Sequence, residues 1–334
     1  MNGQVRWGIL GAGSIAERFA GDIHSASGAE LAAVGARSLE RAQGFADRHG
    51  VPRAFGSYAD LVAADDIDAI YIATPHSLHH EHALLAINAG KSVLIEKPFT
   101  VSTGEAAEIQ STAAERGVFA MEAMWTVCNP LVRKLADRVR SGAIGPVLAL
   151  HANVGPMGFP AKRGGTHRTQ DRSLGASFML ETFSYPLWLI TTIAPQLRQA
   201  ENISAIAAFG PEGIDEIASL QASAPNGPWM AVTGGFAFES SASAESRLHV
   251  IGAAGWAEIR DSLFDPRDIR IHTASGTESL ATEDADRGFA YEIEEASRAI
   301  LAGHEESPLV SLSQSIDVMS ILDRARSSAL TKEQ

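Results

Sequence analysis

The stretch that decides the fold is Val5–Leu10 (VRWGIL), which runs directly into Gly11–Ala16 (GAGSIA). The first part is an apolar, strand-like run, and the second is a G-x-G-x-x-A turn that opens a helix. In such a turn Gly11 permits a tight bend, Gly13 lets the backbone approach a pyrophosphate, and the small Ala16 lets the helix pack closely on the strand. The stretch therefore predicts the first strand–helix unit of a dinucleotide-binding domain.

The start of this helix is a predicted phosphate site. Its free N–H groups, around Ser14 and Ile15, would face the phosphates because the helix dipole favours negative charge there. Taken alone, the pattern has a simpler alternative, an ordinary glycine-rich strand–helix turn.

A second stretch, Ala73–Phe99, makes the interpretation specific. It begins with the strand end Ala-Thr-Pro-His, continues through an expected helix over His79–Ala89, and ends with the strand Ser92–Ile95 and the run Glu96-Lys97-Pro98.

With these motifs the chain resembles the glucose–fructose oxidoreductase/inositol dehydrogenase (Gfo/Idh/MocA) family. The likeness is nearest to its branch of dimeric dihydrodiol dehydrogenases and NADP-dependent D-xylose dehydrogenases, because Met121–Thr126 (MEAMWT) matches the branch's M-E-A-x-W-T. It extends from Val5 to about Arg326, with specific motifs in the N-terminal third and looser ones after Ser141. The resemblance implies an NAD(P)-dependent oxidoreductase with a Rossmann domain, followed by a second domain whose open sheet mediates dimerisation.

The composition is that of an ordinary folded protein. Of 334 residues, 45% are hydrophobic and 20% are charged, and the formal net charge is −13. Such an acidic chain is a poor partner for nucleic acid or for an anionic membrane. The single cysteine, Cys128, excludes an intrachain disulfide and fits a reducing compartment. Because we find neither a signal-peptide pattern nor an apolar run of about 18 residues, we expect a cytoplasmic protein.

The periodicity predicts two domains, 1–124 and 125–334. In the first, strands are expected over Val5–Leu10, Glu30–Ala36, Asp68–Ala73, Ser92–Ile95 and Val118–Met121, and helices over Ile15–Ala26, Leu39–His49, Tyr58–Ala64, His79–Ala89 and Thr103–Arg116. This alternation is typical of an α/β fold with a doubly wound parallel sheet, the Rossmann arrangement. Ligands of such a sheet bind at the carboxyl ends of its strands.

After Trp125 the pattern changes to that of an α+β domain with a large, mostly antiparallel open sheet. Expected helices are Pro130–Arg140, Gly175–Ile193, Tyr291–Ala302 and Ser311–Ser328, and expected strands are Pro146–Val154, Ala205–Phe209, Ile217–Ala222, Met230–Phe238, Arg247–Ile251 and Ala257–Arg260. Between them, Gly155–Asp171 is expected to form a long irregular loop of the kind that often carries function.

The end of the second strand indicates which cofactor binds. NAD sites place an Asp or Glu there for the ribose hydroxyl, whereas NADP sites offer an Arg to the 2′-phosphate. Here Ala36 stands in place of the acid and is followed by Arg37, Ser38 and, one helical turn later, Arg41. Arg37 can bind a phosphate bidentately, and Ser38 can donate a hydrogen bond to it. We expect NADP(H), with NAD(H) as the second choice; the structural alternative is a solvated helix start.

Lys97 and Tyr185 are the expected catalytic residues, together with Glu181. Lys97 follows a buried strand and precedes Pro98, and the resemblance implies that it hydrogen-bonds the nicotinamide ribose and the substrate hydroxyl. The resemblance places Glu181 and Tyr185 at the Asp and Tyr positions of the branch's second-domain signature, Asp-x-Gly-x-Tyr. They lie four residues apart, so both are expected on one helix face toward the cofactor. Tyr185 would act as acid/base, its pKa lowered by the charge of Lys97. The alternatives are a surface lysine paired with Glu96 and an ordinary helix tyrosine.

The remaining expected contacts fall into two groups. By resemblance the cofactor is contacted by Thr74, Pro75, His76, His79 and Glu96, in addition to Gly11, Gly13, Ser14, Ile15, Ala16, Arg37, Ser38, Arg41 and Lys97. The side chains expected around the substrate are Trp125, Phe159, Arg168 and Phe183, with core packing or a solvated loop as alternatives. No metal is expected at the histidine cluster of residues 76–82, because Glu81 is the only carboxylate beside it and no cysteine is near.

Three departures from the branch pattern bear on activity. Glu181 replaces an Asp, Phe183 fills a small Gly position, and Val127-Cys128 replace Arg-Phe. Larger side chains and the loss of a cationic donor would reshape the substrate site or weaken catalysis. We expect an NADP-dependent oxidoreductase that interconverts a hydroxyl and a carbonyl on a sugar, polyol or diol, assembled as a homodimer or homotetramer. The alternative is a non-catalytic NADP-binding sensor or scaffold.

Overall fold

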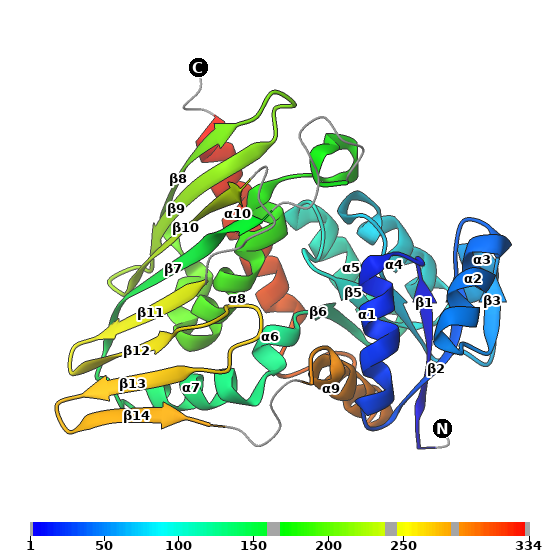
Figure 1. Ribbon diagram of the computed structural model, residues 1–334, viewed down its shortest axis with the longest axis horizontal. Helices are drawn as coiled ribbons and strands as arrows, with labels where there is room; N and C mark the ends of the chain where they lie inside the picture. Colours follow the sequence, from blue (N-terminus) through cyan, green and yellow to red (C-terminus); the bar gives the residue numbers. More distant parts are fainter. Residues whose placement is uncertain (1–2, 159–167, 238–245, 282–286, 331–334) are drawn as a thin grey trace. The chain divides into compact units, whose positions relative to one another are not determined.

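The computed structural model describes residues 3–158, 168–237, 246–281 and 287–330 (Figure 1). The chain divides into two compact units, Met1–Cys128 with Arg287–Ser315, and Asn129–Asp286 with Ile316–Gln334. The sequence pattern predicts a boundary after residue 124, with all later residues in the second domain. The structure groups Arg287–Ser315 with the first unit, because α9 (Ala290–Leu301) packs on the first sheet.

The first unit is built on a six-stranded, wholly parallel sheet. Its strands lie in the order β3-β2-β1-β4-β5-β6, the doubly wound order of a Rossmann fold. They are β1 (Val5–Leu10), β2 (Ala29–Gly35), β3 (Arg53–Phe55), β4 (Ala69–Ile72), β5 (Ser92–Glu96) and β6 (Ala120–Ala123). The α-helices are α1 (Ser14–Asp22), α2 (Leu39–His49), α3 (Tyr58–Val62), α4 (His79–Asn88), α5 (Thr103–Arg116) and α6 (Trp125–Cys128), besides α9, with 3₁₀ turns at Ile23–Ser25 and His76–Leu78.

Both faces of this sheet are buried. On one face Tyr71 of β4 stacks on Phe19 of α1 with ring centroids 3.8 Å apart, and Trp7 of β1 donates a hydrogen bond to Ser297 of α9 at 3.0 Å. On the other face Gly8 lies against Leu61 of α3, and a Cβ placed on Gly8 would lie 3.1 Å from the Leu61 Cδ1 atom. Near-continuous apolar strands are the sequence signature of such a sheet.

The second unit is built on an eight-stranded sheet in the order β14-β13-β12-β11-β7-β10-β9-β8. All its pairs are antiparallel except β7 with β10, so the expected mostly antiparallel sheet, and with it the fold class, is confirmed. The strands are β7 (Val147–Gly158), β8 (Glu201–Phe209), β9 (Asp215–Ser223), β10 (Trp229–Ala237), β11 (Arg247–Gly252), β12 (Gly255–Ile259), β13 (Ile269–Thr273) and β14 (Gly276–Leu280). The long helices are α7 (Pro130–Arg140), α8 (Ser184–Ile193) and α10 (Leu312–Leu330), the last of which runs through the boundary between the units.

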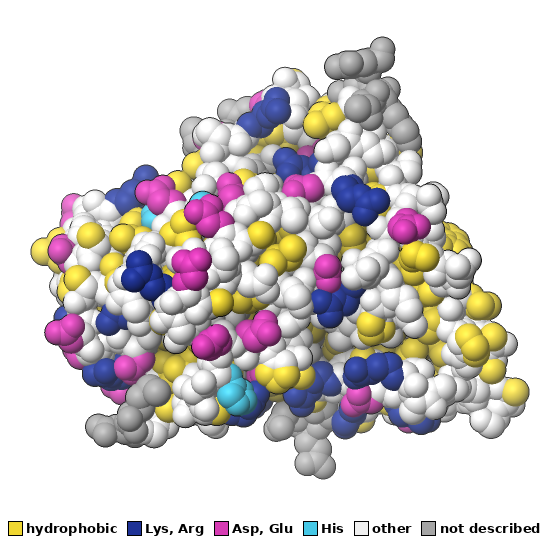
Figure 2. Space-filling model, turned by 180° about the vertical axis from the view of Figure 1, so that it is seen from behind, with side chains coloured by type: hydrophobic (Ala, Val, Ile, Leu, Met, Phe, Trp, Pro, Cys, Tyr) yellow, Lys and Arg dark blue, Asp and Glu magenta, His cyan; other side chains and the backbone are white. Residues whose placement is uncertain are grey.

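The helix α8 packs on one face of this sheet, against β7 and β10, and none of the described helices covers the opposite face. Large hydrophobic side chains are exposed on this sheet: Leu148, Ile206, Ile217, Trp229, Ile251 and Trp256. Figure 2 shows hydrophobic side chains gathered at the right-hand margin, on the side occupied by this sheet.

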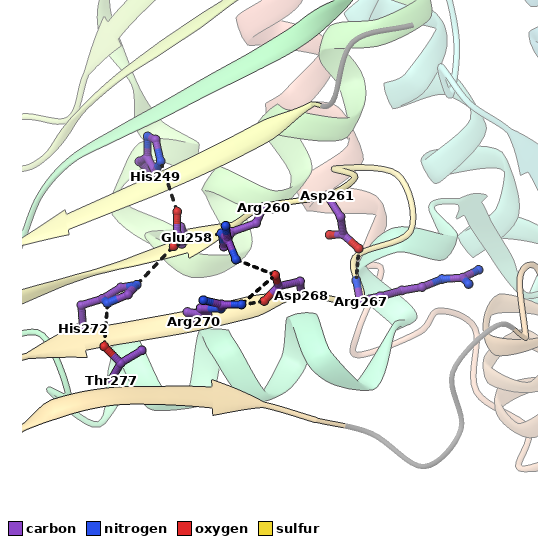
Figure 3. Close-up of polar contacts among 9 residues, drawn as sticks. All are labelled: His249, Glu258, Arg260, Asp261, Arg267, Asp268, Arg270, His272 and Thr277. Atoms are coloured by element: carbon purple, nitrogen blue, oxygen red, sulfur yellow. Dashed lines mark hydrogen bonds and ion pairs between the residues drawn. The ribbon is translucent and has the colours of Figure 1, made fainter.

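Polar side chains on the face opposite α8 join neighbouring strands by ion pairs and hydrogen bonds. Glu258 of β12 lies between His249 of β11 and His272 of β13, with N···O distances of 3.7 and 3.2 Å (Figure 3). Asp268 accepts hydrogen bonds from Arg260 and Arg270. We call the side of the eight-stranded sheet that lies opposite α8 the open sheet face.

Several expected boundaries differ from the structure. The short strand β3 and the hairpin β13–β14 were not expected, because β3 has only three half-exposed residues and β14 is largely exposed, so neither shows a clear apolar period. Strand β7 continues to Gly158, into the expected loop, and residues 159–167 of that loop lie outside the described residues. The expected helix Gly175–Ile193 contains a π-helical turn (Met179–Phe183) followed by α8, and 3₁₀ turns lie outside it at Arg168–Gln170, Arg172–Leu174 and Pro195–Gln199.

Candidate functional site

The turn between β1 and α1 has the geometry of a dinucleotide cradle. Gly11 has φ +107°, and a Cβ placed on it would lie 2.9 Å from the carbonyl oxygen of Ala73, so only glycine fits. Gly13 is exposed, and a Cβ there would meet nothing within 4 Å, which leaves open space beside the backbone. Ala16 is fully buried where α1 meets the sheet.

The start of α1 offers backbone donors to that open space. Its N-cap residue is Gly13, and no side chain caps the helix. Ser14 is exposed and Ile15 half-buried in the first turn, so the unsatisfied N–H groups of this turn face solvent. These features fit a pyrophosphate at the helix N-terminus.

The end of β2 carries two exposed arginines, Arg37 and Arg41, on either side of Ser38. Within the described parts of the chain neither guanidinium pairs with a carboxylate. Ser38 is the N-cap of α2, and its hydroxyl accepts the N–H of Arg41 at 3.4 Å. Burial raises the pKa of the Tyr58 phenol while the charges of Arg37 and Arg41 act to lower it, so both arginines lie near that ring. The cluster fits an anionic group beside the adenosine end of a dinucleotide.

The end of β4 is held by a hydrogen-bonded histidine network. His82 Nδ1 lies 3.0 Å from Thr74 Oγ1, and the His82 ring packs edge-on against Tyr58 at 4.8 Å. Burial lowers the pKa of His82, so its neutral form is favoured. His79 is fully buried, with Nε2 2.9 Å from the Thr74 carbonyl oxygen, and the buried His76 ring lies edge-on to it at 5.6 Å.

At the end of β5 two consecutive polar residues, Glu96 and Lys97, differ in their burial. Glu96 is buried and accepts the hydroxyl hydrogen of Tyr71, so its side chain lies on the α1 face of the sheet. Its second oxygen accepts the backbone N–H of Lys97 at 3.2 Å. The Lys97 side chain is partly exposed, and the Lys97–Pro98 peptide bond is cis. Glu96 is thus a support of the strand end, and Lys97 is the group with access to solvent.

The structure adds a buried acid that no sequence pattern predicts. Glu292 of α9 is fully buried, and neither carboxylate oxygen has a hydrogen-bond partner of normal geometry among the described residues. Burial, followed by the nearby charge of Glu96, raises the pKa of Glu292 well above its usual range. No sequence signal marks it, because a single Glu in an amphipathic helix is usually on the solvent side.

Trp125, an expected substrate residue, lies near Glu292 in the first unit. It is buried, packs edge-on against Phe289 at 5.4 Å, and has the Arg18 guanidinium 4.5 Å from its ring centroid. This is the environment of a core aromatic with a cation–π contact.

The second unit carries Glu181, Phe183 and Tyr185 on the π-to-α segment. Glu181 is partly exposed, and Tyr185 is 8% exposed with its ring edge-on to Phe264 at 4.7 Å. Asp215 of β9 accepts the N–H of Met179 at 2.8 Å and so fixes the start of this segment. Because π-helical hydrogen bonds run from i to i+5, the simple four-residue rule for one helix face does not apply across it.

The other expected substrate residues divide between the core and the undescribed part of the chain. Phe183 is fully buried and packs edge-on against Phe178 at 5.5 Å, so it offers no exposed surface. Phe159 lies outside the described residues. Arg168 begins the short 3₁₀ turn Arg168–Gln170.

Metal-type clusters and membrane-spanning helices are both absent from the described residues. No group of three or more His, Cys, Asp or Glu residues there is arranged to hold a metal ion. None of the described helices has the length and apolar character that crossing a membrane requires.

Comparisons with known proteins agree with this architecture. Residues 5–124 match the family model GFO_IDH_MocA, described as an oxidoreductase family with an NAD-binding Rossmann fold. The chain is 31% identical to trans-1,2-dihydrobenzene-1,2-diol dehydrogenase of Bos taurus, over 96% of either sequence.

Two solved structures share the whole fold. KijD10, a 3-ketoreductase from Actinomadura kijaniata in complex with NADP and TDP-benzene, has a TM-score of 0.84 at 24% identity, covering 97% of this chain and 98% of its own. Levoglucosan dehydrogenase in complex with NADH and levoglucosan has a TM-score of 0.86 at 17% identity, covering 98% of both chains. From the cradle at β1–α1, the sheet order and these likenesses, the chain belongs to the Gfo/Idh/MocA family of oxidoreductases and is an NAD(P)-dependent dehydrogenase.

Proposed function

We propose that the protein is an NADP(H)-dependent dehydrogenase that interconverts a secondary or anomeric hydroxyl and a carbonyl on a sugar, polyol or diol. The observation that carries the cofactor choice is the pair of exposed arginines, Arg37 and Arg41, that flank Ser38 where an NAD site would have an acid. The substrate class is supported by the bovine relative, which is named for a diol, and by two solved neighbours, which are named a 3-ketoreductase and a levoglucosan dehydrogenase.

In the proposed reaction the bound nicotinamide supplies the hydride acceptor or donor. The Tyr185 phenol takes the proton from the substrate hydroxyl, or returns it in the reverse direction. The Lys97 ammonium donates a charge-assisted hydrogen bond to the same oxygen. A phenol of ordinary pKa, about 10, is a poor base at neutral pH, and a nearby cation favours the phenolate. Glu181 is the proposed third member of this set.

The first experiment measures NADP reduction by the purified protein at mildly alkaline pH, with NAD in parallel. The substrate panel holds aldoses, inositols, anhydrosugars and trans-dihydrodiols, and NADPH binding is followed separately. We expect turnover with NADP on at least one member, lost in Lys97→Ala and in Tyr185→Phe. Tight NADPH binding without turnover in either direction would instead support a non-catalytic sensor.

The cofactor choice has its own test. Replacement of Arg37 and Arg41 by Ala is expected to weaken NADPH binding at least tenfold and to leave NADH binding within about threefold, because only NADPH carries the 2′-phosphate. Arg48→Ala is the matched control, since this arginine of the same helix pairs with Glu17 at 2.9 Å. Equal losses for both cofactors would refute the assignment.

We also propose that the open sheet face pairs with a second copy in a homodimer or homotetramer. It exposes large apolar side chains, among them Ile206 (59%) and Ile217 (55%), and contiguous apolar surface of this kind marks interfaces. We expect the variant Ile206→Glu/Ile217→Glu to shift the mass measured by light scattering toward the monomer. Leu39→Glu is the control, because Leu39 is equally exposed (58%) on the other unit. A monomeric wild type would contradict the proposal.

A further inference from the structure

The His79 side chain joins two neighbouring strand ends of the six-stranded sheet. His79 is the first residue of α4 and is completely buried. Its Nδ1 lies 2.9 Å from the carbonyl oxygen of Pro98, and its Nε2 lies 2.9 Å from the carbonyl oxygen of Thr74. Thr74 follows β4 and Pro98 follows β5, so one ring ties the segment that carries Lys97 to the end of the adjacent strand.

This geometry determines how many protons the ring must carry. A carbonyl oxygen can only accept a hydrogen bond, and a neutral imidazole has a single N–H. In either neutral tautomer one ring nitrogen would therefore point its lone pair at a buried carbonyl oxygen. Only the imidazolium form of His79 donates to both Thr74 and Pro98.

A buried cation needs a nearby anion, and the chain provides one through a single peptide unit. Glu122, at the end of β6, is 1% exposed, and its Oε1 accepts the N–H of Phe99 at 3.1 Å. The carbonyl oxygen of that same Pro98–Phe99 peptide faces His79 Nδ1. The peptide thus lies between an imidazole and a carboxylate, and hydrogen bonds arranged in such a chain strengthen one another.

Three other carboxylates of the surrounding elements have contacts elsewhere. Glu108 of α5 pairs with His80 at 2.9 Å on the surface, and Glu105 accepts the N–H of Val101. Glu96 lies on the opposite face of the sheet, bonded to Tyr71.

Three further titratable groups lie on the elements packed around α4. His76 presents its ring edge-on to His79, and His82 bonds Thr74 Oγ1 rather than the carbonyl. On α3, Tyr58 packs on the His82 ring. Of the carboxylates on these elements, Glu122 is the one linked to the His79 ring through a hydrogen-bonded peptide.

We propose that His79 is held as an imidazolium whose charge is balanced by Glu122 through the Pro98–Phe99 peptide, and that this pair positions Lys97. His79 and Glu122 are positioning residues, because each acts on the backbone beside Lys97. The second half of the proposal rests on the proposed function of Lys97, whereas the first half does not.

The protonation state is tested directly by nitrogen NMR of the full chain labelled with ¹⁵N-histidine. The sequence has 11 histidines, so the His79 signals are assigned by their absence from His79→Gln. At pH 7.5 we expect both ring nitrogens of His79 to have the ¹⁵N chemical shift of a protonated nitrogen. His82 should instead have one protonated and one unprotonated ring nitrogen. A bare nitrogen on His79 in the wild type would overturn the proposal.

The role of Glu122 is tested by Glu122→Gln, whose amide oxygen can still accept the Phe99 N–H. We expect the midpoint for loss of the second His79 proton to fall by at least one pH unit, a tenfold change in the proton-binding constant. Glu108→Gln is the matched control and should leave this midpoint unchanged. An unchanged midpoint in Glu122→Gln would remove Glu122 from the proposal.

The positioning of Lys97 is tested by kinetics on the wild type and Glu122→Gln. We expect kcat to fall at least tenfold and the NADPH dissociation constant to change less than threefold, and kcat to recover partly at the lower pH where His79 regains its second proton. An unchanged kcat would refute the positioning role. If the wild type turns over no substrate, the proposed function fails, and the NMR result alone still decides the protonation of His79.

Discussion

The two sheets of this protein differ in the surroundings of their polar side chains. In the six-stranded sheet both faces are covered, and the polar residues at its strand ends are buried with defined roles: Glu96 on Tyr71, Glu122 on Phe99, and His79 between two carbonyl oxygens. In the eight-stranded sheet no described helix covers the outer face, and Glu258 lies between the half-buried His249 and His272, whose rings contact the exposed Trp256. We therefore expect single polar changes to cost much in the first sheet and little on the open sheet face.

The largest expected effects are on activity, one from each unit. Lys97→Ala and Tyr185→Phe should each lower kcat/KM by about 10²- to 10⁴-fold, the range for removal of a general acid/base or of a charged donor at the reacting oxygen. Circular dichroism and NADPH titration should show both variants folded, because Lys97 is partly exposed and Phe conserves the Tyr185 ring against Phe264. Retention of activity in either variant would remove that residue from the mechanism.

The next effect is on the free energy of unfolding, and it differs between two glycines of one turn, Gly11 and Gly13. Gly11→Ala should destabilise the first unit by about 2–4 kcal/mol, because it combines φ +107° with a 2.9 Å contact to the Ala73 carbonyl oxygen. Gly13→Ala should change stability by less than about 1 kcal/mol, since its Cβ would meet nothing within 4 Å. Denaturant unfolding checks the first statement. The same unfolding measurement on Gly13→Ala checks the second, and titration of this variant with NADPH should show weaker binding, because the added methyl would fill the phosphate space.

A smaller effect concerns Glu292 and depends on pH. Burial raises its pKa in the folded protein, so the folded state keeps a proton that the unfolded chain loses above about pH 4.3. The wild type should therefore lose stability as pH rises toward the folded pKa. Glu292→Gln removes this titration, so its stability relative to the wild type should grow with pH, by at most about 1.4 kcal/mol per pH unit.

Urea unfolding of both proteins at pH 5 and pH 8 measures this difference. Glu17→Gln, on the exposed side of α1, is the matched control and should show no such growth. A stability difference that stays constant between the two pH values would show that Glu292 does not titrate in this range.

The smallest effect is expected on the open sheet face. Glu258→Gln removes the charge between His249 and His272 but keeps a hydrogen-bonding group, and should change the free energy of unfolding by no more than about 1 kcal/mol. A loss of several kcal/mol would mean that this face is as tightly organised as the covered sheet. The measurement is the urea midpoint of the variant against the wild type at pH 7.

Local signals were sufficient for many elements. The helices Leu39–His49, Thr103–Arg116 and Pro130–Arg140 occur with the expected bounds, because each has its start signal beside it: Ser38 and Ser102 cap the first two, and Asn129 caps the third. The π-helical turn before Tyr185 and the short or exposed strands β3 and β14 have no comparable sequence signal. They form because of contacts with parts of the chain that the local pattern does not record.

The sequence by itself determined the class of the protein: the glycine turn, the strand–helix alternation and the Glu-Lys-Pro run are local patterns, and the structure and comparisons confirm the family they indicate. Only the tertiary structure decided which polar side chains face solvent and which are buried. Arg37 and Lys97 remain accessible, whereas His79, Glu122 and Glu292 enter the core of the first unit. The reason is physical, because burial and hydrogen-bond partners come from strands and helices far apart in the sequence, and no local pattern records them.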